Sequence, residues 1–119
     1  MKENLSIVEM LRMQQDLWEK HSAEFLPLSP QYGKESILWM IGEIGECISI
    51  IKKRGDTAIV QNSIVRAAFV EEMCDVLMYY FDVMLRFNIT SSELSSAFID
   101  KHNKNMNRNF KDEYSQEIL

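Results

Sequence analysis

The chain has 119 residues and a mass of 14.0 kDa, a length that suits one domain and leaves no room for two. Apolar residues make up 46% and charged residues 26%, with only four glycines and two prolines, which excludes disordered, collagen-like and disulfide-scaffold proteins. The net charge of −5 argues against nucleic acid as a partner, because sequence-independent binding needs a broad basic surface.

The cysteine content and the N-terminal segment predict a soluble, cytoplasmic protein. Residues 1–15 carry charges every few positions and lack the apolar stretch of a signal peptide. The longest apolar run, residues 76–81, is too short to cross a membrane, so we expect no membrane partner. Cys47 and Cys74 are expected to be free thiols that fill the core as small apolar groups.

A helical period of apolar residues runs through the chain, and no strand-like alternation persists. We expect four helices, caps included, over residues 5–23, 34–54, 62–87 and 90–108. Asn62 is the expected N-cap of the third helix, Thr90 and Glu93 have capping-box spacing, and Gly55 ends the second helix. The predicted fold is all-α.

The domain organisation follows from the same pattern. No linker, repeat or low-complexity stretch interrupts the chain, so residues 1–111 are predicted to form a single helical domain of four to five helices. Residues 112–119 are predicted to form a polar C-terminal tail.

The helix over residues 34–54 carries acidic residues in an apolar setting. Most positions from 37 to 51 are apolar, so we expect this helix to be buried around most of its circumference. The exceptions gather on one side, because residues three and four apart are neighbours on a helix: Gly42, Glu43, Gly45, Glu46 and Ser49. The glycines each lower helix stability by roughly 1 kcal/mol relative to alanine, which suggests that a ligand approaches the backbone there.

The helix over residues 62–87 repeats this design. Its polar positions fall on a single stripe: Glu72, Asp75, Tyr79, Asp82 and Arg86. The two acidic pairs are either the solvated faces of amphipathic helices or parts of one metal site. Lysine and arginine are absent from the central turns of both stripes, and four like charges that face each other need a cation, which favours the metal site.

The ligand type indicates which metal to expect. Carboxylate oxygens favour Mg²⁺, with Mn²⁺ as the alternative, whereas the absence of a Glu-x-x-His motif disfavours a di-iron site. Because Mg²⁺ in proteins is usually coordinated by phosphate groups of the substrate as well as by carboxylates, a phosphorylated ligand is expected. Lys101, Asn105 and Arg108 share one face of the last helix and suit phosphate oxygens, although basic residues there also complement the helix dipole.

Taken in chain order, these motifs resemble those of the MazG-like all-α nucleoside triphosphate pyrophosphohydrolases, a superfamily that includes dimeric dUTPases and dCTP pyrophosphatases. The matching motifs are Glu43-x-x-Glu46, Glu72-x-x-Asp75 and Lys101-x-x-x-Asn105-x-x-Arg108. The one departure is Gly42, which stands where the family usually has the first of two adjacent glutamates.

The resemblance implies cleavage of the α–β phosphoanhydride of a nucleoside triphosphate, giving the monophosphate and pyrophosphate, in a homodimer or a dimer of dimers. The implied metal ligands are Glu43, Glu46, Glu72 and Asp75. The implied phosphate contacts are Lys101, Asn105 and Arg108. Either Glu46 or Glu71 would orient or deprotonate the attacking water, and the sequence does not choose between them.

Four side chains are candidates for a base pocket. Tyr79 lies one turn beyond Asp75, and Trp39 lies one turn before Glu43. Trp18 and Gln14 share a face of the first helix and could close over a base by stacking and hydrogen bonding. The alternative is that these aromatic residues belong to an ordinary core.

Two other functions compete with the enzyme. One is a non-catalytic helical dimer that binds a nucleotide or a metal and has a regulatory role. The other is a purely structural helical oligomer. The presence of all four predicted carboxylate ligands favours the enzyme.

Overall fold

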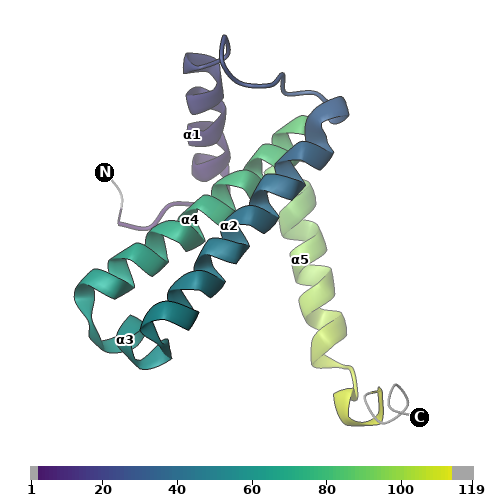
Figure 1. Ribbon diagram of the computed structural model, residues 1–119. Coiled ribbons are helices and arrows are strands. Elements are labelled where there is room, and N and C mark those ends of the chain that lie inside the picture. The colour runs from purple at the N-terminus through teal and green to yellow at the C-terminus, as the bar shows by residue number, and fades with distance from the viewer. Residues whose placement is uncertain (1–2, 114–119) are drawn as a thin grey trace. The chain divides into compact units, whose positions relative to one another are not determined.

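The computed structural model describes residues 3–113, and all regular secondary structure in that range is helical (Figure 1). The elements in chain order are α1 (Ile7–Lys20), the 3₁₀ helix η1 (Pro30–Tyr32), α2 (Gly33–Arg54), α3 (Asp56–Gln61), α4 (Ser63–Arg86) and α5 (Ser91–Met106). The all-α prediction is therefore confirmed for the described residues. Most of the tail predicted over residues 112–119 lies outside them.

The expected residues cap the long helices: Asn62 and Thr90 at their N-termini and Gly55 at a C-terminus. The Asn62 side chain accepts hydrogen bonds from two backbone N–H groups in the first turn of α4, at 3.0 and 3.2 Å. Thr90 Oγ1 accepts one from the backbone N–H of Glu93 at 3.1 Å. Gly55 adopts a φ of 85°, in the left-handed region that favours glycine, and its N–H donates to the carbonyl of Ile51 at 2.8 Å.

Two local features were not in the predicted pattern. The short helix α3 has only six residues, too few to show a helical period of apolar positions. At the start of α1, Ser6 and Glu9 form a reciprocal capping box, so this helix begins later than residue 5.

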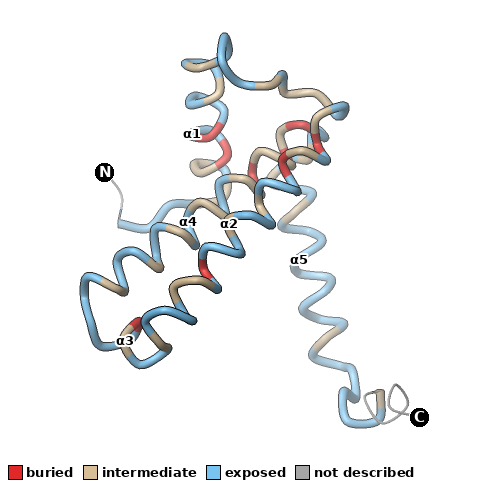
Figure 2. The backbone as a smooth tube through the Cα atoms, in the orientation of Figure 1, coloured by how far each residue is buried: buried red, intermediate tan, exposed pale blue. Residues whose placement is uncertain are grey.

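Helices α2 and α4 lie side by side along most of their lengths, and α3 reverses the chain between them (Figure 1). Helix α1 packs against α4 as well. The buried apolar side chains of the described residues are Leu11, Cys47, Ile59, Phe81 and Met84. Figure 2 shows that most buried positions lie on α1, at the start of α2 and at the end of α4, with single positions further along α2 and on α3.

Within the single chain, residues 37–51 are not buried on most sides, and their burial by a second copy remains a prediction. Five large apolar residues of α2 remain between 41% and 56% exposed: Leu38, Ile41, Ile44, Ile48 and Ile51. The physical reason is that α2 packs mainly on α4, and one neighbouring helix covers only one side of it. Cys47 is buried as expected, but Cys74 is exposed, which corrects its assignment to the core.

A buried arginine fastens the loop after α1 to the helix pair. Arg86 is 3% exposed, and it donates hydrogen bonds to the carbonyl oxygens of Leu26 at 3.2 Å and Pro27 at 3.3 Å. It also donates to the hydroxyl of Ser36 at the start of α2. A buried guanidinium is tolerated only when its N–H groups have partners, so these contacts hold the loop in place.

The chain divides into two compact units, residues 1–89 and residues 90–119. The first unit contains the helices from α1 to α4, and the second contains α5. Among the described residues, no helix is both long enough and apolar enough to cross a membrane.

Candidate functional site

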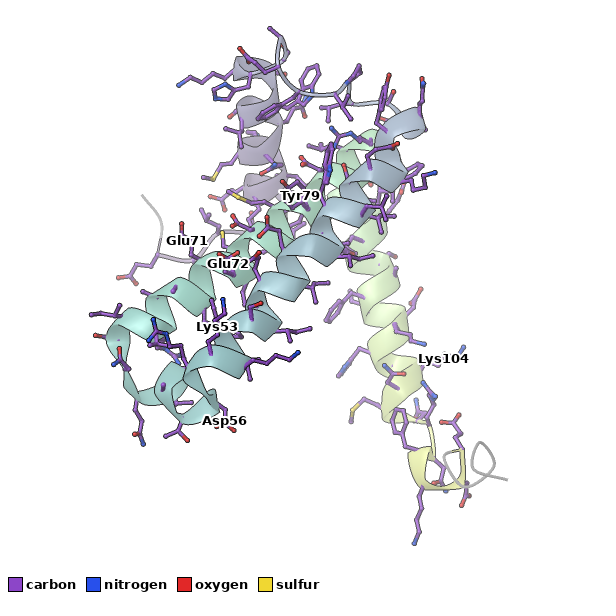
Figure 3. The ribbon with its side chains drawn as sticks, in the orientation of Figure 1. Lys53, Asp56, Glu71, Glu72, Tyr79 and Lys104 are labelled. Atoms are coloured by element: carbon purple, nitrogen blue, oxygen red, sulfur yellow. The ribbon has the colours of Figure 1, made fainter. Side chains whose placement is uncertain are left out.

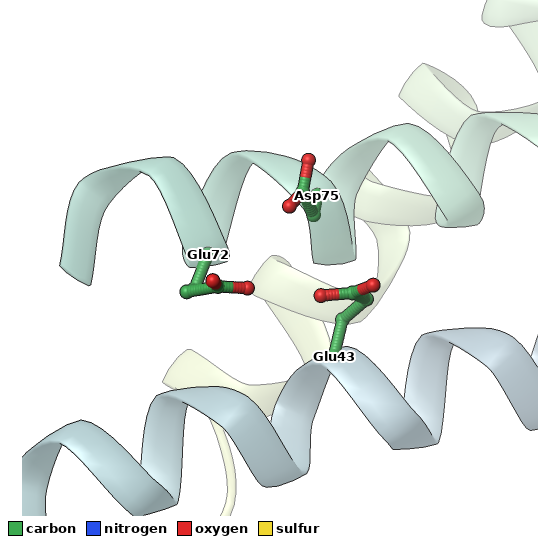
Figure 4. A group of neighbouring side chains, drawn as sticks. All are labelled: Glu43, Glu72 and Asp75. Atoms are coloured by element: carbon green, nitrogen blue, oxygen red, sulfur yellow. The ribbon is translucent and has the colours of Figure 1, made fainter. Parts of the chain in front are cut away.

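Three carboxylates converge between α2 and α4. Glu43 comes from α2, whereas Glu72 and Asp75 come from α4, and one oxygen of each lies within 4.8 Å of the other two (Figure 4). All three residues are partly buried. Two ligands on opposite sides of a Mg²⁺ ion are about 4.2 Å apart, so this spacing suits a shared cation after a small adjustment of side chains.

The surroundings of Glu72 disfavour the ionised form of its carboxyl group. Its pKa is raised above the usual value, first by the hydrogen bond with Glu43, then by desolvation, and then by the negative charges of Glu43, Asp75 and Glu46. All of these contributions disfavour the ionised form. The cluster therefore favours the uptake of a proton or of a cation.

Two neighbouring groups respond to the same negative field. Burial raises the pKa of the Cys47 thiol, and the charges of Glu72 and Glu43 raise it further. Desolvation raises the pKa of the Tyr79 hydroxyl, and the charge of Glu43 adds to that shift. Both groups are therefore held in their neutral forms beside the carboxylates.

The remaining predicted acidic residues lie outside this group of three. Glu46 and Glu71 are exposed, and neither belongs to the cluster (Figure 3 labels Glu71 beside Glu72). Glu46 is nevertheless close enough for its charge to raise the pKa of Glu72. The roles of Glu46 as a ligand and of Glu46 or Glu71 as the base remain predictions.

A pocket of about 670 Å³ adjoins the carboxylates, within the range of small-molecule sites. Glu43 and Asp75 line it. The structure also brings the four predicted base-pocket residues to its wall: Gln14, Trp18, Trp39 and Tyr79. Helices α1, α2 and α4 thus each contribute to one hollow in the first unit.

The aromatic walls of the pocket are held by specific contacts. The rings of Trp39 and Tyr79 have centroids 6.0 Å apart and planes inclined at 51°. The indole N–H of Trp18 donates to the carbonyl of Leu26 at 2.8 Å, which fixes its orientation. Leu17, Phe25 and Met78 add apolar surface, so the walls suit a flat, largely apolar ring.

Sequence reasoning gave no site role to three charged residues of this pocket: Glu24 from the segment after α1, and Asp82 and Arg86 from α4. Gln14 Nε2 donates to Asp82 Oδ1 at 2.9 Å, and Arg86 Nη1 lies 3.8 Å from Asp82 Oδ2. Desolvation raises the pKa of Asp82, and the Gln14 hydrogen bond and the Arg86 charge oppose that shift. The available signal was the polar stripe on α4, which continues past Tyr79 to Asp82 and Arg86.

The predicted phosphate-binding residues belong to the second unit. Arg108 Nη1 donates to the side-chain oxygen of Asn105 at 3.2 Å, and Arg108 Nε pairs with Glu113 at 2.9 Å. The Arg108 guanidinium also lies over the ring of Phe110, 4.5 Å from its centroid. Lys101 is exposed. Contact between these residues and a phosphate remains a prediction.

No family model, curated protein or solved structure matches the chain. Its function must therefore be inferred from its own residues.

We expect Glu72→Gln to raise the melting temperature in EDTA at neutral pH. A carboxyl whose pKa is higher in the folded chain destabilises the fold above that pKa, and the penalty disappears as the pH falls to the unfolded value of 4.5. The difference in melting temperature between the variant and the wild type should therefore become smaller as the pH is lowered. Thermal melts followed by circular dichroism measure it.

Glu71→Gln, one residue away and exposed, is the matched control and should melt like the wild type. A lower melting temperature for Glu72→Gln in EDTA would show that the carboxylates do not repel one another as described.

Proposed function

We propose that the protein is a nucleotide pyrophosphohydrolase that needs a divalent cation and cleaves a nucleoside triphosphate into the monophosphate and pyrophosphate. The observation that carries this proposal is the junction of an acidic cluster with an aromatic pocket. Glu43 and Asp75 belong to both. The ordered motifs that resemble the MazG-like enzymes support the same reaction.

Glu43, Glu72 and Asp75 would hold the cation, which we take to be Mg²⁺ or Mn²⁺. Their oxygen donors, their spacing and the raised pKa of Glu72 all fit such an ion. Exposed Glu46 would add a fourth carboxylate from the next turn of α2. When bound, the ion would supply charge neutralisation for the triphosphate and lower the pKa of a coordinated water.

The other residues have separable roles in this proposal. Glu46 or Glu71 would orient and deprotonate the attacking water. Trp39 and Tyr79 would hold the base against the pocket wall. The polar residues of the last helix would neutralise the charge on the leaving pyrophosphate: Lys101, Asn105 and Arg108. We place the activity in the cytoplasm, where free thiols stay reduced.

The hydrolysis assay should show metal-dependent release of equimolar monophosphate and pyrophosphate from at least one nucleoside triphosphate. The panel comprises each common NTP and dNTP with Mg²⁺, and products are separated by ion-exchange chromatography. Glu43→Gln should lower the rate at least about 100-fold, because it removes a carboxylate shared by the ion site and the pocket.

Asp16→Asn changes an exposed carboxylate of α1 in the same way and should leave the rate unchanged. Binding of nucleotides without turnover would favour the non-catalytic regulator. An unchanged rate in Glu43→Gln would contradict the proposed site.

We also propose that the protein is a homodimer or a dimer of dimers, with α2 at the interface between copies. The exposed apolar residues of α2 recur every three or four positions, so they form one stripe: Leu38, Ile41, Ile44, Ile48 and Ile51. An apolar surface of this continuity is unusual on a monomer and is typical of an interface.

Light scattering during gel filtration should give at least twice the 14.0 kDa mass of one chain. The double variant Ile41→Glu, Ile48→Glu should elute with the mass of one chain, because two charges would be buried in the interface. Gln61→Glu adds a charge at an exposed position of α3 and should not change the mass. A wild-type protein of 14.0 kDa would contradict the proposed interface.

A further inference from the structure

The pocket has a polar end that lies away from the acidic cluster. Along α4, Asp82 follows Asp75 by seven residues, which places the two roughly 10 Å apart along the helix axis. Asp75 belongs to the acidic cluster, whereas Asp82 accepts a hydrogen bond from Gln14 of α1. Aromatic and apolar side chains line the interval, among them Tyr79 and Met78. A sugar and a base could bridge this interval if the phosphates lie at the acidic cluster.

The hydrogen-bonding character of the polar end is set by its fixed contacts. Gln14 Nε2 donates one N–H to Asp82, which leaves its second N–H and its amide oxygen for other partners. The Asp82 carboxylate has lone pairs beyond the one that Gln14 uses, and an ionised carboxylate can only accept. The polar end therefore presents mainly acceptors to a ligand.

Three of the five N–H groups of Arg86 are already engaged. The three guanidinium nitrogens of Arg86 donate to Leu26, Pro27 and Ser36. The indole N–H of Trp18 donates to Leu26 as well. These contacts leave Arg86 as a positioning residue, which fixes the loop and balances the charge of Asp82 at 3.8 Å.

We propose that Asp82 and Gln14 select a nucleobase that carries an exocyclic amino group, and that the site discriminates against bases with a carbonyl at that position. An amino group of cytosine or adenine donates two N–H bonds, which the acceptors of this end can take. The carbonyl of uracil or hypoxanthine places an oxygen against the lone pairs of a carboxylate, where it is desolvated and repelled. The inference deepens the proposed function, because it names the substrate class of the same pocket.

Two pairs of deoxynucleoside monophosphates test the contact between the exocyclic group of the base and the polar end of the pocket. dCMP and dUMP differ at position 4 of the pyrimidine, as amino against carbonyl. dAMP and dIMP differ in the same way at position 6 of the purine. Size, sugar and phosphate are matched within each pair, so a difference in affinity reports the change from amino to carbonyl together with the change of the adjacent ring nitrogen from acceptor to N–H donor.

The experiment measures binding of these four nucleotides to the full chain in EDTA, by quenching of tryptophan fluorescence. Trp18 and Trp39 are the two tryptophans of the chain, and both line the pocket. The readout needs neither metal nor turnover. We expect dCMP to bind at least about tenfold more tightly than dUMP, and dAMP at least about tenfold more tightly than dIMP.

Asp82→Asn replaces an acceptor by a donor with little change of shape, so it should bring both affinity ratios toward parity by improving the binding of dUMP and dIMP. Asp16→Asn makes the same change on the exposed face of α1 and should preserve both ratios. If Asp82→Asn does not fold, the affinities of the paired nucleotides for the wild-type protein still test the base assignment.

The outcomes for the two proposals are distinct. Equal affinities within both pairs, or no quenching at millimolar nucleotide, would overturn the base assignment even if triphosphates are hydrolysed. Selective binding of the amino bases without any hydrolysis would support the base assignment and overturn the enzyme. Ratios that persist in Asp82→Asn would also overturn the role given to Asp82.

Discussion

The repulsion among Glu43, Glu72 and Asp75 is the constraint around which the first unit is organised. Packing α2 against α4 brings one oxygen of each carboxylate within 4.8 Å of the others. Every contribution to the pKa of Glu72 raises it, so none stabilises the ionised carboxylate. A helix pair that served only to bury apolar surface would avoid such a cluster. The helix pair therefore holds the three carboxylates on regular elements rather than on loops, as a rigid site for the proposed cation would require.

Helix α4 sets out the chemistry of the site in a fixed order. Successive steps of three or four residues carry the stripe from the clustered carboxylates to Tyr79 in the aromatic wall, then to Asp82 at the polar end, and finally to the buried Arg86. Since helical rise fixes the spacing between these positions, the distance from phosphate to base would be built into one element. Arg86 matters here because it ties the loop that carries Leu26, a partner of Trp18, to the end of this helix.

Much of this arrangement could be predicted from local patterns. The helices, the Asn62 cap and the end of α2 at Gly55 depend on interactions and backbone preferences within a few neighbouring residues. The two acidic pairs were found because helical spacing alone places their members on one face. Gln14, Trp18, Trp39 and Tyr79 do line one pocket, although their roles there remain predictions.

The rest depends on contacts between distant segments. The partnership of Gln14 with Asp82 joins residues 68 positions apart, which no local period reveals. Apolar periodicity likewise showed that α2 has several apolar sides, but not which of them its neighbouring helix covers. It could not show that Ile41 and Ile48 stay exposed in the single chain. Glu46 lies outside the cluster although it follows Glu43 by the same three residues that separate Glu72 from Asp75, so helical spacing alone does not decide which carboxylates converge.

The most direct measurement of the central claim is the anomalous scattering of Mn²⁺ in crystals of the full chain. The account predicts a manganese peak within coordination distance of Glu43, Glu72 and Asp75, and its loss in Glu43→Gln crystals soaked in the same way. Ordered carboxylates with no manganese between them at millimolar Mn²⁺ would contradict the account.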